Sequence, residues 1–107
     1  MKNPIKILVY SKNPATLNII LRLINKEGNW EGEGVTNEVE VFEKCHETPY
    51  QILLLGSGIS SISEQRVRSM LAIQRPGIRI VQHYGGGSGL LANEIMHTLS
   101  GSELDIK

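Results

Sequence analysis

Cysteine is almost absent from this chain, since Cys45 is the only one among its 107 residues. A single cysteine excludes an intrachain disulfide and favours a reducing, cytoplasmic setting. The sequence has no apolar run approaching the ~20 residues that cross a bilayer, and its first residues lack the profile of a secretory signal. We therefore expect a cytoplasmic protein without a membrane span.

An excess of positive charge is also absent, because 11 Lys and Arg residues balance 11 Asp and Glu residues. Binding to nucleic acid without sequence preference needs a basic surface, so we expect no nucleic-acid partner. Three histidines and one cysteine, scattered along the chain, have no metal-ligand spacing. We expect no metal and no cofactor.

The residues that are present alternate between two patterns over a length that suits one domain, residues 1–107. Apolar segments at 5–10, 30–35, 50–55 and 78–84 predict strands, the second an edge strand because of its Glu-Gly-Glu-Gly content. A helical pattern follows each strand, and residues 102–107 are a candidate fifth strand. Alternating units of this length predict a three-layer α/β fold, with helices on both faces of an open parallel sheet of four or five strands.

Local signals predict where the helices begin and which residues they bury. Asn13 before Pro14 favours one start, and two pairs resemble capping boxes, Asn37 with Glu40 and Ser61 with Glu64. Helical spacing predicts buried faces in the second, third and fourth helices: Val39, Phe42, Cys45 and His46; Val67, Met70 and Leu71; and Leu91, Ile95 and Leu99.

Three stretches, KILVYSKNP, YQILLLG and IRIVQHYGG, carry a resemblance to a known family. In order and length of elements, nearly the whole chain resembles a response-regulator receiver domain, which has a flavodoxin-like fold. The family's final helix is missing here. Ligands of such folds bind beyond the carboxyl ends of the strands, so we expect any site in the loops 11–14, 56–61 and 84–88.

The resemblance also places the family's phosphorylation site on this sequence. Its acidic pair falls on Ser11 and Lys12, its phosphoacceptor aspartate on Gly56, and its hydroxyl switch residue on Tyr84. Receiver chemistry uses carboxylates to hold Mg²⁺, and Lys12 would repel that ion. The resemblance therefore implies a degenerate receiver without phosphoaspartate chemistry.

From these observations we expect a phosphorylation-independent pseudo-receiver that regulates bacterial-type two-component signalling by protein–protein interaction, and not an enzyme. Ser57 beside His83 would need an acidic partner to act in nucleophilic catalysis, and none is evident. A rival hypothesis is a small anion- or nucleotide-binding module. It would use Lys12 with the glycine-rich loop at Gly87, Ser88 and Gly89, although a mobile loop is the simpler interpretation of residues 85–89.

Self-association is the last expectation. In a receiver layout the first and fifth helices cover one sheet face and the other three cover the opposite face, and we expect no fifth helix here. The first helix also carries Ile19 and Leu23 outside its main apolar stripe, which is Leu17, Ile20, Leu21 and Ile24. A homodimer that packs this face against its copy would bury both features.

Overall fold

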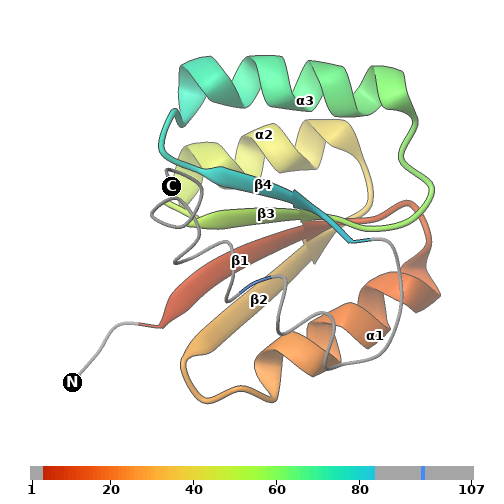
Figure 1. The fold of residues 1–107 in the computed structure, drawn as a ribbon, viewed down its shortest axis with the longest axis vertical. Helices are drawn as coiled ribbons and strands as arrows, with labels where there is room; N and C mark the ends of the chain where they lie inside the picture. The colour runs from red at the N-terminus through yellow and green to blue at the C-terminus, as the bar shows by residue number, and fades with distance from the viewer. Residues whose placement is uncertain (1–3, 84–94, 96–107) are drawn as a thin grey trace, which may run out of the picture.

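The computed structural model describes residues 4–83 and residue 95. Its strands are β1 (Ile5–Tyr10), β2 (Trp30–Val35), β3 (Ile52–Leu55) and β4 (Arg79–Gln82), and its helices are α1 (Pro14–Asn25), α2 (Glu38–Glu47) and α3 (Ser61–Gln74). All strands pair in parallel, in the order β2-β1-β3-β4 (Figure 1). The predicted α/β fold with an open parallel sheet is confirmed.

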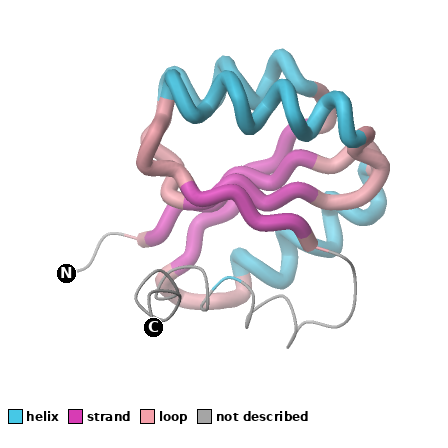
Figure 2. The backbone as a smooth tube through the Cα atoms, turned by 45° about the horizontal axis from the view of Figure 1, so that its top comes forward, coloured by secondary structure: helices cyan, strands magenta, loops and turns pink. Residues whose placement is uncertain are grey.

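The helices form layers on both faces of this sheet. Helices α2 and α3 lie side by side on one face, and α1 lies on the other (Figure 2). In the strand register, Tyr10 at the end of β1 pairs with Val35 of β2 and with Leu55 of β3. The carboxyl ends of three strands therefore meet at one edge of the sheet.

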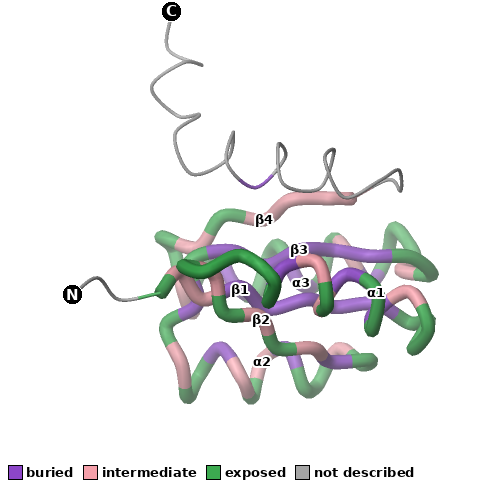
Figure 3. Tube along the Cα trace, turned by 90° about the horizontal axis from the view of Figure 1, so that it is seen from below, coloured by how far each residue is buried: buried purple, intermediate pink, exposed green. Residues whose placement is uncertain are grey.

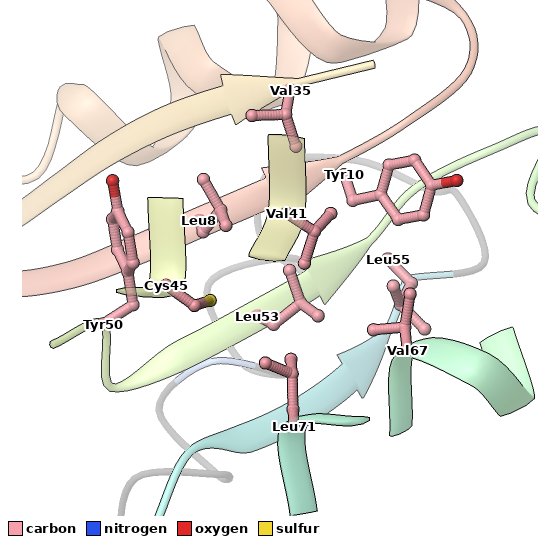
Figure 4. Close-up of a cluster of buried hydrophobic side chains, with 10 residues drawn as sticks. All are labelled: Leu8, Tyr10, Val35, Val41, Cys45, Tyr50, Leu53, Leu55, Val67 and Leu71. Carbon is pink, nitrogen blue, oxygen red and sulfur yellow. The ribbon is translucent and has the colours of Figure 1, made fainter. Parts of the chain in front are cut away.

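The core is divided by the sheet into two clusters. Alternate residues of β1 point to opposite faces, Leu8 and Tyr10 toward α2 and α3 (Figure 4), Ile7 and Val9 toward α1. All of β3 is buried, as expected for a strand with helices on both faces. Burial is concentrated in β1 and β3 at the centre of the sheet (Figure 3).

The edge strand β2 fits its helix through two glycines. A Cβ on Gly32 would lie 2.9 Å from Cγ2 of Ile24, and one on Gly34 would lie 2.7 Å from Cδ1 of Leu17. Helix α1 can therefore pack directly on the strand backbone. Asn25, at the end of α1, binds the same strand, since its Oδ1 accepts from the Gly32 N–H at 2.8 Å and its Nδ2 donates to the Gly32 carbonyl at 3.4 Å.

Helix starts agree with the sequence at two places and differ at the third. Asn13 caps α1, accepting from Thr16 N at 3.0 Å, and Asn37 caps α2, accepting from Glu40 N at 2.9 Å. The cap of α3 is Ser60, whose hydroxyl accepts from Ser63 N at 3.1 Å. The prediction of Ser61 was wrong by one residue, because adjacent serines give equivalent local signals.

Some predicted helix faces were also wrong. The buried residues of α2 are Val41 and Cys45, whereas Val39 is 64% exposed and His46 is exposed. In α3, Val67 and Leu71 are buried as predicted, but Met70 is 49% exposed. The face that each helix turns to the sheet is shifted from the predicted one, so that it includes Val41 in α2 and Ser63 in α3.

Residue 95 corrects the expected layout of the end of the chain. Ile95 is helical and fully buried in the cluster that contains α1. The receiver layout places the element after the fourth strand on the face of α2 and α3, so this expectation was wrong for residue 95. Ile95 therefore helps α1 to bury the other face of the sheet, the one on which α1 lies. The rest of the predicted fourth helix and the candidate strand 102–107 lie outside the described residues.

Candidate functional site

The loops that follow β1 and β3 are joined at the carboxyl edge of the sheet. Gly56 N donates to the Tyr10 carbonyl at 2.7 Å, and Lys12 N donates to the Ser57 carbonyl at 2.9 Å. The sequence-predicted residues Ser11, Lys12 and Gly56 are thus brought together. Tyr84, Gly87, Ser88 and Gly89 lie outside the described residues.

Ser11 is fully buried and holds this junction closed. Its Oγ lies 3.3 Å from each of two carbonyl oxygens, those of Asn13 and Ser57, and it accepts from Asn13 N at 3.3 Å. A hydroxyl surrounded by backbone in this way is a loop-to-loop connector. It is not available to a ligand.

Gly56 occupies a position with no room for a side chain. A Cβ built there would lie 2.8 Å from the Ser11 Cβ, 3.0 Å from the Ser11 Oγ and 3.5 Å from Cδ1 of Ile20. Carbon atoms that are not bonded to one another are most stable at about 3.5 to 4.0 Å, so the approach to the Ser11 Cβ is a collision. The space beyond the end of the buried strand β3 is therefore filled by Ser11, the residue that follows the neighbouring strand β1.

Lys12 runs alongside the next glycine of the β3 loop. Gly58 has a φ of +82°, and a Cβ on it would lie 2.8 Å from the Lys12 Cβ, so a glycine is needed there both for conformation and for space. The Lys12 side chain is exposed. The pKa of Glu38 is lowered chiefly by its hydrogen bond from Arg66, and the charge of Lys12 contributes in the same direction.

A pocket with a volume of about 510 Å³ lies between α1 and the ends of β3 and β4. Its described lining is mainly apolar, with four polar side chains, Thr16, Ser57, Gln82 and His83, beside Ile19, Ile20, Leu23 and Ile59. Its volume falls within the usual range for small-molecule sites, and it lies at the edge where α/β folds bind ligands. Ser57 and His83 both line it, as the strand order implied.

The predicted dimer face on α1 is exposed at one position and partly covered at the other. Ile19 is 55% exposed, whereas Leu23 is half-buried and packs against the cluster on the α1 side. Self-association through these residues stays a prediction.

The sequence analysis missed a chain of hydrogen bonds that links β1 with α2 and α3, on the face of the sheet opposite to α1. Ser63 donates to Glu38 at 2.9 Å, so Tyr10 Oη donates to Ser63 at 3.0 Å. Arg66 closes the chain with two bonds to the Glu38 carboxylate, at 2.7 and 2.9 Å. The available signal was the polar position 63 on the buried face of α3, together with a tyrosine at the end of a buried strand.

A second polar cluster lies at the opposite end of the same core. The Tyr50 hydroxyl donates to the Glu33 carboxylate, and Lys44 Nζ lies 3.5 Å from it. The hydrogen bond from Tyr50 is the main cause of the lowered pKa of Glu33. Burial is the main cause of the raised pKa of Tyr50, and the Glu33 carboxylate adds to it. Figure 4 shows the two tyrosines at opposite ends of the cluster.

Two further findings concern metals and membranes. Within residues 4–83 and residue 95, no group of three His, Cys, Asp or Glu side chains is placed to ligate a metal ion. In the same part of the chain, no helix has the length and apolar character needed to cross a bilayer.

The fold, with its strand-end loops, defines a receiver-like α/β domain, and known structures agree. A response regulator receiver protein from Pseudomonas putida matches 92% of this chain over 81% of its own length, with a TM-score of 0.63 and 17% identity. A pilus assembly-related protein from Burkholderia pseudomallei matches 88% of this chain and 72% of its own, with a TM-score of 0.62 and 18% identity. An adenylate cyclase structure from Rhodopirellula baltica matches 96% of both chains, with a TM-score of 0.59 and 14% identity.

At these identities the likeness concerns the fold. No protein-family model matches the sequence, and no curated protein matches it.

Proposed function

We propose that this chain is a cytoplasmic pseudo-receiver, a signalling domain that works without phosphorylation and acts through contact with a protein partner or with a second copy of itself. The observation that supports this most directly is the closed end of β3. The aspartate of the resemblance falls on Gly56, where a side chain would collide with the Cβ of Ser11. The position lacks a carboxylate, and Ser11 occupies the space that a side chain would need.

The neighbouring residues support the same proposal. The acidic pair of the resemblance falls on Ser11, whose hydroxyl is engaged with backbone carbonyls, and on Lys12, whose charge opposes a divalent cation. Without carboxylates at these positions, Mg²⁺ lacks its usual oxygen ligands and the phosphoryl group lacks an acceptor. What remains is a folded scaffold with exposed surfaces, which suits a role in protein contacts and not in catalysis.

Incubation with acetyl phosphate and Mg²⁺, followed by intact-mass measurement, tests this proposal. A receiver domain with its aspartate serves as the positive control. We expect the mass of this chain to stay unchanged while the control gains one phosphoryl group. A gain of one phosphoryl group that is lost on treatment with hydroxylamine would contradict the proposal.

A second candidate function is small-ligand binding, which the pocket beside α1 favours. Lys12 does not line this pocket, but it packs against Gly58, which does. An anion or nucleotide at the mouth of the pocket would be recognised by the charge of Lys12. A thermal-shift series with phosphate, nucleotides and Mg²⁺ tests it, because a ligand that binds only the folded state raises Tm. A rise with a phosphate compound that disappears in Lys12→Ala would support this function; an unchanged Tm throughout the series favours the pseudo-receiver.

A further inference from the structure

Helix α3 carries large apolar residues on both of its sides. Val67 and Leu71 are buried against the sheet, while Ile62 is 62% exposed and Ile73 is 83% exposed on the outside. A helix that packs on one side only has a polar outer face. The outer row of α3 from Ile62 to Ile73 contains one charged residue, Arg66, and that residue is paired with Glu38.

The adjacent helix extends this apolar surface. Val39 of α2 is 64% exposed, and α2 and α3 lie side by side (Figure 2), joined by Glu38 with Arg66 and by Gln74 with the Phe42 carbonyl. Helical spacing places four exposed residues along the outer side of the seam between these helices. They are four of the five large hydrophobic residues exposed in the described part of the chain, and we call them the outer strip: Val39, Ile62, Met70 and Ile73.

Opposite charges flank the outer strip. Glu40, Glu43 and Glu47 of α2 line a hollow next to Gly34 and Val35 of β2, and Lys44 lines it with them. The hollow stays acidic, because three carboxylates outweigh one ammonium group and Lys44 already pairs with Glu33. On the other flank, Arg68 and Arg75 line a hollow next to Ile78 and Ile80, beside β4. Arg68 pairs with Glu64 at 2.9 Å and Arg75 donates to the carbonyls of Cys45 and His46, so this flank stays basic through two guanidinium groups against one carboxylate. Since β2 and β4 are the outer strands of the sheet within residues 4–83, the outer surface runs from an acidic flank across an apolar strip to a basic flank.

Such a surface is complementary to itself. A two-fold axis that lies in the interface, parallel to the seam, places each outer strip on its copy and each acidic flank over a basic one. The formal net charge of zero at pH 7 means that two copies do not repel one another overall. A partner of one dominant charge would meet a matching charge on only one flank.

We propose that the outer strip is the contact surface of a two-fold dimer of this chain, with the acidic flank of α2 facing the basic flank of α3 in the partner. This rests on the proposed function and gives it a partner and a face. It also places self-association on the side of the sheet opposite to Ile19 and Leu23.

Sedimentation velocity from low to high micromolar concentration tests the dimer, and the chain offers a matched control. Ile73→Glu, at 83% exposure, puts a charge in the strip, and Ile19→Glu, at 55% exposure, puts the same charge on α1. We expect wild type and Ile19→Glu to dimerise with similar affinity and Ile73→Glu to bind at least tenfold more weakly. Circular dichroism checks that each variant is folded, and Ile62→Ser gives a second variant without a new charge.

A charge exchange tests the orientation. Glu43→Arg alone and Arg68→Glu alone should each weaken the dimer. The double variant should recover affinity, because the two flanks again carry opposite charges, with the signs exchanged. A monomer at every concentration, or a dimer lost with Ile19→Glu and kept with Ile73→Glu, would overturn this inference while leaving the proposed function intact. Phosphorylation by acetyl phosphate would overturn the proposed function and leave the dimer interface standing.

Discussion

The Cβ that Gly56 lacks would lie 2.8 Å from the Cβ of Ser11, so these two positions share space for a single side chain. We predict that Gly56→Ala lowers the free energy of unfolding by about 1 to 3 kcal/mol, as overpacking of a filled core does. Urea unfolding at neutral pH measures this.

Two variants sharpen that test. Gly28→Ala is the matched control, because a Cβ at Gly28 meets nothing within 4 Å, and it should have little effect. Adding Ser11→Gly to Gly56→Ala should recover part of the loss, since the colliding atoms are removed. Additive losses in the double variant would contradict the shared-space explanation.

The buried chain from Tyr10 to Arg66 predicts a specific cost at Ser63. Ser63→Ala removes the acceptor of the buried Tyr10 hydroxyl and one donor to Glu38, which should cost about 1 to 3 kcal/mol. Ser69→Ala, an exposed serine on the same helix, controls for the change in helix propensity. Equal unfolding free energies for the two variants would contradict a structural role for this chain.

The hydrogen bond between Tyr50 and Glu33 predicts that the free energy of unfolding falls at both low and high pH. The pKa of Glu33 is lowered from 4.5 in the folded chain. Its contribution to the free energy of unfolding is therefore present above pH 4.5 and is lost as the pH falls through the folded pKa. Because the pKa of Tyr50 is raised from 10.0, its contribution is present below that pH and is lost as the pH rises through the folded pKa.

The variant Tyr50→Phe isolates this bond. At pH 7 we expect wild type to exceed Tyr50→Phe in unfolding free energy by about 1 kcal/mol, a modest value because Glu33 is half exposed. The difference should shrink below pH 4.5 and again above pH 10.0. A difference that stays constant from about pH 3 to about pH 11, a range that spans the ordinary pKa values of both groups, would exclude the charged bond as its source.

The hydrogen bonds of Asn25 lead us to predict that it protects the edge strand β2 from aggregation. Its amide occupies the N–H and C=O groups of Gly32 on the edge strand β2, and unoccupied edge groups invite pairing with other chains. We expect Asn25→Ala to lower the temperature at which static light scattering detects aggregation. Asn18→Ala, at an exposed position of the same helix, should leave that temperature unchanged.

The sequence predicted most where the signals are local. Asn13 and Asn37 mark their helix starts because a cap contacts residues only three positions away, and the Glu-Gly-Glu-Gly segment indicated the edge strand. Contacts distant in sequence escaped prediction. The collision between positions 11 and 56, the Ser63 chain and the burial of Ile95 on the α1 side all depend on how elements are placed in space, which no local pattern contains.

The carbonyl groups at the end of α2 are bound by residues from the end of α3. Gln74 donates to the Phe42 carbonyl at 3.1 Å, and Arg75 donates to the carbonyls of Cys45 and His46 at 2.7 and 3.2 Å. The carbonyl groups of the last turn of α2 are thus satisfied only when the end of α3, about 30 residues later in the sequence, has packed against them. The two helices should form and open as one cooperative unit, so their amides should share a single opening free energy in native-state hydrogen exchange.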